Sequence, residues 1–175
     1  MRLSRSIALT SFFALLASPT LWAQLKENLD LPFDALGEEE EEEEAPEVVN
    51  FYNTNLEGDG FFYVVDCSGS MRDSGELQRA KTEINKNITE FSNRVQFGIV
   101  FFDSKLYKFP SSGQRPEPSE AMKQAAKGFV TSQQGASGSC CQQGLIGGLQ
   151  FANKAKSRRK VLVYLGDGGG TCMGG

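Results

Sequence analysis

Two hydroxyls and a carboxylate alternate along one short segment of the chain. Asp66, Ser68 and Ser70 occupy positions i, i+2 and i+4, directly after a run of apolar residues. In an extended or turning segment this spacing lets the three side chains point their oxygens to one side, and Gly69 lets the chain bend around what they hold. Oxygen ligands suit Mg²⁺, Mn²⁺ or Ca²⁺. The segment is therefore a candidate part of a divalent-metal site.

A second carboxylate and a third hydroxyl complete the candidate site. Asp167 lies between Gly166 and Gly168 at the end of another apolar run, and Ser139 follows Gly138 just before a helical segment. Taken singly, each pattern is typical of a turn, but the carboxyl ends of parallel strands share one edge of a sheet, where ligands bind. The predicted metal-binding residues are Asp66, Ser68, Ser70, Ser139 and Asp167.

The chain has 175 residues and no histidine. This absence excludes Ser-His-Asp and Cys-His catalytic centres, zinc sites that use imidazole, and general acid-base catalysis by histidine. Any chemistry must come from carboxylates, hydroxyls, thiols or lysine.

The elements that must position these residues are strands and helices in alternation. Three apolar runs have the composition of strands buried on both faces: Phe61–Val65, Val95–Phe102 and Val161–Leu165. Helical segments separate them, and strands joined by helical crossovers pair in parallel. The sequence therefore predicts an α/β fold, a doubly wound and mostly parallel open sheet flanked by helices.

Apolar residues recur every three or four positions in the helical segments, which predicts one buried face on each helix. The first series is Leu77, Ala80, Ile84, Ile88 and Phe91, and the second is Met122, Ala125, Ala126 and Phe129. A last helix runs from about Cys141 to Lys156. Its predicted inward residues are Leu145, Leu149 and Ala152, with Gly147-Gly148 allowing close contact with the sheet.

The chain divides into three predicted parts. Residues 1–23 have the layout of a secretory signal peptide, with an apolar run shorter than the roughly 20 residues that cross a bilayer. Residues 24–57 are predicted to be an acidic disordered linker, because the contiguous glutamates from Glu38 to Glu44 repel one another. Residues 58–175 form the folded body. The net charge of −4 thus combines an acidic linker with a mildly basic body.

Export places the four cysteines in an oxidising compartment, where disulfides form. Cys140 and Cys141 are adjacent, so a bridge between them would be strained. We expect one of them to pair with Cys172 or Cys67. A soft-metal site made of thiolates is the less favoured alternative, since it needs a reducing environment or protected thiolates.

The segment Asp66-Cys67-Ser68-Gly69-Ser70, placed after an apolar strand, resembles the von Willebrand factor type A domain and its metal-ion-dependent adhesion site. The resemblance extends from about Asp59 to Gly175 and includes the Asp-Gly end of the third apolar run. Sheets of this family usually continue for about two further strands, so the resemblance implies that residues 58–175 are a C-terminally incomplete domain.

The resemblance also implies a role for each site residue. The serines of the first segment, Ser68 and Ser70, bind the metal directly, whereas Asp66 and Asp167 act mostly through waters. Ser139 stands where the family usually has a threonine, and serine lacks the methyl group that restrains the rotamer.

By resemblance, the chain is a secreted or periplasmic binding module and not an enzyme. Its metal accepts an Asp or Glu carboxylate of a protein partner, and we expect no nucleic-acid binding and no membrane span after signal cleavage. The alternative is a Mg²⁺-dependent phosphoryl-transfer enzyme similar to the haloacid-dehalogenase-like phosphatases, with Asp66 as nucleophile. Those enzymes have a second aspartate two residues later, where this chain has Ser68.

Overall fold

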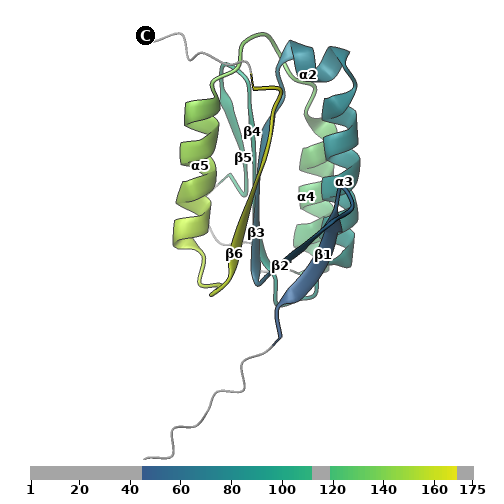
Figure 1. The fold of residues 1–175 in the computed structure, drawn as a ribbon, viewed down its shortest axis with the longest axis vertical. Coiled ribbons are helices and arrows are strands. Elements are labelled where there is room, and N and C mark those ends of the chain that lie inside the picture. The colour runs from purple at the N-terminus through teal and green to yellow at the C-terminus, as the bar shows by residue number, and fades with distance from the viewer. Residues whose placement is uncertain (1–44, 112–118, 169–175) are drawn as a thin grey trace, which may run out of the picture. The chain divides into compact units, whose positions relative to one another are not determined.

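The computed structural model describes residues 45–111 and 119–168 (Figure 1). The chain divides into two units, residues 1–44 and residues 45–175. The predicted signal peptide and the run of glutamates lie in the first unit, outside the described residues.

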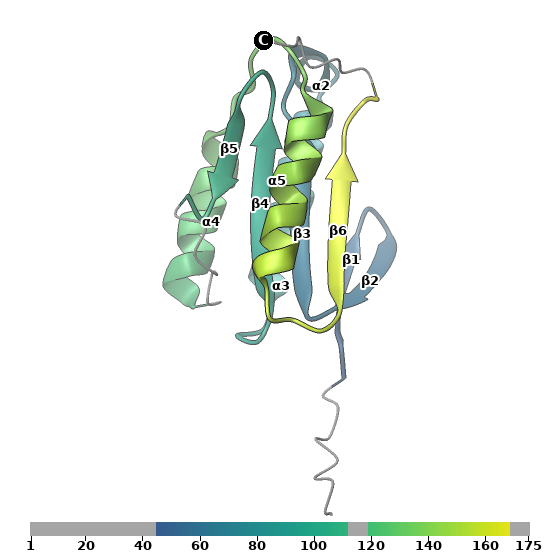
Figure 2. The ribbon, with the colours of Figure 1, turned by 90° about the vertical axis from the view of Figure 1, so that its left-hand side faces the viewer.

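The centre of the fold is a four-stranded sheet in the order β5-β4-β3-β6. Strands β3 (Gly60–Asp66), β4 (Gln96–Phe102) and β6 (Lys160–Leu165) are parallel, and only the short β5 (Leu106–Phe109) is antiparallel to its neighbour. Figure 2 shows the three parallel strands ending at the same edge of the sheet. The predicted α/β class with a mostly parallel sheet is confirmed.

Helices cover both faces of this sheet. Helices α3 (Glu76–Glu90) and α4 (Glu120–Ser132) lie on one face and α5 (Cys141–Lys154) lies on the other (Figure 1). The short α2 (Gly69–Asp73) follows β3 at the carboxyl edge. The predicted buried face of α3 is confirmed, since Leu77, Ala80, Ile84 and Ile88 are all buried.

Strand β3 is buried along its whole length, and its alternate side chains serve different faces. Phe61, Tyr63 and Val65 belong to the large core under α3 and α4. Phe62 belongs to a smaller core with Val100 and with Phe151 of α5. This burial on both faces explains why the strand reads as an unbroken apolar run.

Helix α5 contacts the sheet through glycines rather than through leucines. Gly144, Gly147, Gly148 and Phe151 are its buried residues. A Cβ atom at Gly148 would collide with the side chain of Val64. The helix can therefore lie this close to the sheet only because residue 148 is a glycine. The prediction that Leu149 faces inward is wrong, because its side chain is 58% exposed.

A β-hairpin lies inside the segment predicted to be a disordered linker. Strands β1 (Glu47–Phe51) and β2 (Thr54–Gly58) pair antiparallel, and Tyr52 and Asn53 between them have positive φ angles. Two such residues are the signature of a tight hairpin turn. The linker prediction is therefore wrong for residues 47–57, because Val49 and Phe51 bury their side chains in the large core.

Helices α3 and α4 exchange lysine caps. Lys81 near the start of α3 donates to the carbonyl oxygens of Thr131 and Gln133 at the end of α4. Lys123 near the start of α4 donates to the carbonyl oxygen of Phe91 at the end of α3, at 2.6 Å. Each ammonium group thus lies at the negative end of the other helix dipole, and the two helices run antiparallel.

Within residues 45–111 and 119–168, no helix combines the length and the apolar character needed to cross a membrane.

Candidate metal centre

Asp66 ends β3 at the carboxyl edge of the sheet and is 1% exposed. Its Oδ1 accepts a hydrogen bond from the backbone N–H of Ser68 at 2.7 Å. This bond turns the chain out of the strand and into α2, which has Ser68 at its N-cap. The hydroxyls of Ser68 and Ser70 then lie 3.1 Å apart. The structure therefore brings the first three predicted residues together.

Ser139 joins this group from the loop between α4 and α5. Its hydroxyl donates to Oδ2 of Asp66 at 2.6 Å, across 73 positions of sequence. Earlier in the same loop, Ala136 forms a parallel bridge with Ser68. Gly135 has a φ of +73° and lies so close to the carbonyl oxygen of Cys67 that a Cβ atom would collide with it. The loop is thus fixed against the segment that follows β3.

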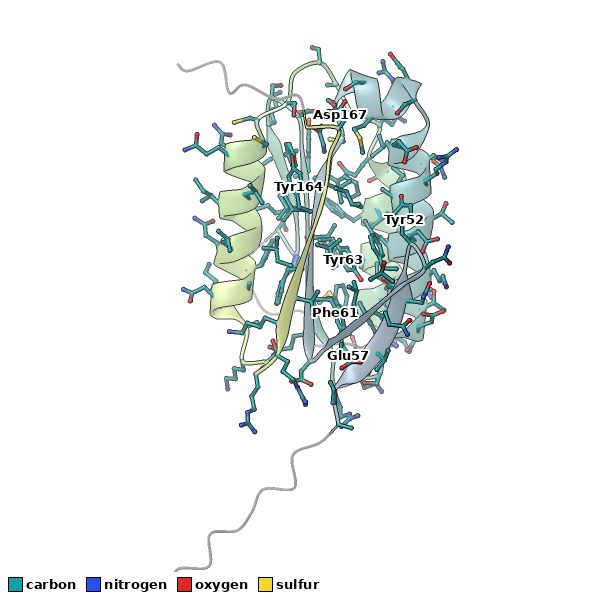
Figure 3. All side chains as sticks on the ribbon, viewed as in Figure 1. Tyr52, Glu57, Phe61, Tyr63, Tyr164 and Asp167 are labelled. Carbon is teal, nitrogen blue, oxygen red and sulfur yellow. The ribbon has the colours of Figure 1, made fainter. Side chains whose placement is uncertain are left out.

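Asp167 lies at the same edge of the sheet, two positions after β6. Leu165 is the register partner of Val65, which places the chain after β6 beside Asp66. Figure 3 shows Asp167 at the end of the sheet where α2 lies. Asp66 and Ser68 are buried, whereas Ser70 and Asp167 are exposed. The group is therefore open to solvent on one side.

Tyr164 of β6 borders the group. Its ring stacks on Phe102 with centroids 6.0 Å apart, and a Cβ atom at Gly166 would lie 2.8 Å from its hydroxyl oxygen. Burial raises the pKa of this hydroxyl, and the charges of Cys141, Asp66 and Asp167 raise the pKa further. The phenol therefore stays protonated and remains a hydrogen-bond donor beside the carboxylates.

Among the residues that the structure describes, the cysteines form no cluster that could be the alternative thiolate site. Cys67 is fully buried, and neither Cys67 nor Cys141 is in a disulfide. Burial raises the pKa of Cys67 to about 12, with Asp103 and Asp66 adding to the effect, so the thiol stays neutral. The expected pairing with Cys67 is wrong. A bond from Cys140 to Cys172 stays a prediction, because Cys172 lies outside the described residues.

Asp103 is a buried carboxylate of this edge that the sequence prediction missed. It directly follows β4 and is 1% exposed. Its Oδ1 accepts from the backbone N–H of Lys105 at 2.7 Å, and its Oδ2 accepts from the hydroxyl of Tyr107 at 3.2 Å. The signal that could have found it is the one that found Asp66: an aspartate placed directly after a buried strand.

The donor set fits a hard divalent cation. All five predicted residues offer oxygen, and both hydrogen bonds described for Asp66 come from neutral groups. Two carboxylates balance two positive charges. No three histidine, cysteine or acidic residues of the described ranges lie close enough to hold a metal. A cation at this edge would therefore depend on the hydroxyls of the three serines.

A groove of about 550 Å³ reaches this edge from the side of the hairpin. Phe51 and Leu56 of the hairpin and Val161 and Val163 of β6 give it an apolar lining. Asp167 also lines it, so the groove is continuous with the candidate centre.

Comparisons with known proteins give no match to any protein-family model or curated protein. Several solved structures match in fold. A von Willebrand factor type A protein from Catenulispora acidiphila is 21% identical, with a TM-score of 0.55 over 62% of this chain and 26% of that one. The pilus adhesin SpaC from Lactobacillus rhamnosus GG is 22% identical, with a TM-score of 0.53 over 73% of this chain and 16% of that one.

The von Willebrand factor domain of the type V pili tip protein Mfa5 from Porphyromonas gingivalis is 15% identical, with a TM-score of 0.52 over 62% of this chain and 37% of that one. The chain thus spans between 16% and 37% of the length of these three structures. Together with the sheet order and the covering helices, these matches show that the chain has the fold of a von Willebrand factor type A domain.

Proposed function

We propose that this chain is an exported protein-binding module that works through a divalent cation, Mg²⁺ before Mn²⁺ or Ca²⁺. The cation would be held by the oxygen donors at the carboxyl edge of the sheet and would accept an Asp or Glu carboxylate of a protein partner. The residues assigned to it are Asp66, Ser68, Ser70, Ser139 and Asp167.

The observation that carries this proposal is the 2.6 Å hydrogen bond between Ser139 and Asp66. It joins two loops that come from different parts of the chain, and the Ser68–Ser70 pair lies beside it. The polar groups thus meet at the carboxyl edge of a parallel sheet, and this edge is where open α/β folds bind their ligands.

Each residue has a task that follows from its position. The three serines offer hydroxyl oxygens to the cation. The buried Asp66 fixes Ser68 and Ser139 through its two oxygens and supplies negative charge beneath them. The exposed Asp167 supplies the second negative charge at the open side. A bound cation would add a Lewis-acidic position for a carboxylate from outside.

The class of partner is proposed from the solved structures of the same fold. SpaC is a pilus adhesin and Mfa5 is a pilus tip protein. We infer by analogy that this chain acts in adhesion or protein interaction outside the cytoplasm, as its predicted signal peptide also implies. Nucleic acid is not an expected partner.

A phosphoryl-transfer enzyme is not favoured. A nucleophilic Asp66 would need an oxygen that a phosphate can approach, yet this carboxylate is buried and each of its oxygens already accepts a hydrogen bond. We therefore assign no catalytic residue and propose that the chain is not an enzyme.

Thermal unfolding of the full chain with and without Mg²⁺ tests the proposal. We expect Mg²⁺ at a large excess over its Kd to stabilise the fold by about 2–3 kcal/mol, which raises the unfolding temperature by several degrees. The Ser68→Ala variant should lose this shift. Ser92→Ala is the matched control, because Ser92 follows α3 at the other end of the sheet and should keep it. Equal responses of the parent and Ser68→Ala would refute the proposed site.

A further inference from the structure

The turn between β4 and β5 holds a buried carboxylate that is no candidate ligand of the cation. Asp103 is 1% exposed, and its two oxygens accept from the N–H of Lys105 and the hydroxyl of Tyr107. Hydrogen bonds to a carboxylate are about twice as strong as neutral ones. Asp103 thus closes the turn from inside, by tying the end of β4 to the start of β5.

The backbone of this turn holds both loops of the candidate centre. The carbonyl oxygen of Phe102 accepts from the N–H of Cys67 at 2.8 Å, and that of Asp103 accepts from the N–H of Cys140 at 2.9 Å. Cys67 is the neighbour of Ser68, and Cys140 is the neighbour of Ser139. Two consecutive carbonyls therefore set where the two loops lie relative to each other.

The turn also packs directly against the loop that carries Ser139, where Ser104 lies against Gly138. Gly138 has a φ of +98°, and a Cβ atom there would lie 3.2 Å from the Cβ of Ser104. A shift of the turn would therefore move Ser139 through packing as well as through the hydrogen bond of its neighbour. The position of Ser139 therefore depends on two contacts with the turn, one on each side of this residue.

We propose that Asp103 is a positioning residue of the metal centre, which it serves by fixing the β4–β5 turn that holds the Ser68 and Ser139 loops. This inference rests on the proposed function. Tyr107 is its partner, because its hydroxyl donates to Oδ2 of Asp103 at 3.2 Å, a shorter hydrogen bond than the 3.5 Å one from the hydroxyl of Ser104. Loss of the carboxylate should let the two loops separate and weaken cation binding without removing any ligand.

Calorimetric titration of the full chain with Mg²⁺ tests this role. Asp103→Asn keeps the side-chain volume but turns an acceptor oxygen into an NH₂ donor that faces an N–H or an O–H donor. We expect its Kd for Mg²⁺ to rise about tenfold or more, at a temperature where circular dichroism shows a folded chain. Tyr107→Phe removes one hydrogen bond and keeps the carboxylate, so its Kd should rise by a smaller factor.

Asp59→Asn is the matched control. Asp59 accepts from the backbone and guanidinium of Arg159 at the amino edge of the sheet, so its loss should lower the unfolding temperature and leave the Kd unchanged. If Asp103→Asn behaves in the same way, or fails to fold while Tyr107→Phe binds as the parent does, Asp103 is merely structural and the inference is wrong. If the unaltered chain binds no Mg²⁺, the proposed function fails and the inference fails with it.

Discussion

At the scale of single residues, Tyr63 begins a hydrogen-bond chain through the large core. Its hydroxyl donates to Oδ1 of Asn87 at 2.9 Å, and Nδ2 of Asn87 donates to the carbonyl oxygen of Asn50 at 2.8 Å. Tyr63 and Asn87 are both fully buried. The chain of bonds thus links β3, α3 and the hairpin.

The ionisation of Tyr63 should appear in the pH dependence of stability. Burial raises the pKa of Tyr63 above its ordinary value of 10.0, and Glu90 raises it further. The unfolded chain therefore loses this proton first, so the stabilisation is complete below pH 10 and is lost as the pH rises above 10, by at most about 1.4 kcal/mol per pH unit.

We expect Tyr63→Phe to be less stable than the parent by about 1–2 kcal/mol at pH 7, because Asn87 loses its donor. Above pH 10 the difference should shrink, since phenylalanine cannot ionise. Urea unfolding at a series of pH values from 7 to 11 measures both proteins. A difference that does not change with pH would contradict the assigned pKa direction.

How far the site could be predicted also depends on single residues. The sequence identifies Asp66, Ser68 and Ser70 because they lie at alternate positions of one short segment. It identifies Ser139 because this residue directly precedes a helical segment. Asp103 follows a buried strand as Asp66 does, but the residues at i+2 and i+4 are Lys105 and Tyr107, and Tyr107 reads as part of a strand. Its role comes from hydrogen bonds that only the folded turn creates.

At the scale of elements, the buried glycines of α5 reverse the usual effect of a glycine-to-alanine substitution on the stability of a helix. Alanine favours a helix over glycine by about 1 kcal/mol. Gly128 of α4 has no atom within 4 Å of where its Cβ would lie, whereas a Cβ at Gly148 would collide with Val64.

We therefore expect Gly128→Ala to stabilise the fold by about 1 kcal/mol and Gly148→Ala to destabilise it by about 1–3 kcal/mol. Chemical denaturation of the two variants and the parent provides the comparison. Changes of the same sign in both variants would show that α5 does not lie as close to the sheet as described.

The same helix shows why the prediction for Leu149 is wrong, whereas Ala152 packs against the smaller core as predicted. The pattern of Leu145, Leu149 and Ala152 marks an apolar stripe, but the contact with the sheet is made by Gly144, Gly147 and Gly148. The predicted close contact of Gly147-Gly148 with the sheet is confirmed. The side chains that fill this interface are Phe62 and Val100 of the sheet and Phe151 of the helix, and the helix sequence contains only its own part of this contact.

The hairpin was missed for a different reason. The predicted linker extends from the contiguous glutamates to Glu57, although the alternation around Val49 and Phe51 already has the period of a strand. Asn53 suits a positive φ, but Tyr52 does not. The turn is held by the pairing of the two adjacent strands and by the burial of Phe51 in the large core, and the second of these is a non-local contact.

At the scale of the whole molecule, the layers of the fold could be predicted from the sequence, whereas the order of the strands within the sheet could not. Three apolar runs separated by helical periods are enough to give a parallel sheet with helices on it. The position of β6 beside β3, rather than beside β4, is a tertiary contact between segments about 100 residues apart.

The redox state of the whole chain gives a further prediction. Since neither Cys67 nor Cys141 is in a disulfide, we expect the chain to hold one disulfide, between Cys140 and Cys172. Thiol titration of the denatured, unreduced chain should give two thiols, and reduction should give four. A count of four before reduction would contradict the bond, and a count of zero would contradict the two cysteines outside a disulfide.

The exchanged lysine caps of α3 and α4 also decide which amines of the molecule can react. Lys81 and Lys123 are buried, and each donates hydrogen bonds to carbonyl oxygens at the end of the opposite helix. An acylating reagent must reach the amine, so these two are out of its reach while the helices stay paired. Acetylation of Lys81 or Lys123 would thus show that the helix pair has opened. Acetylation of the exposed lysines does not require this opening and would not show it.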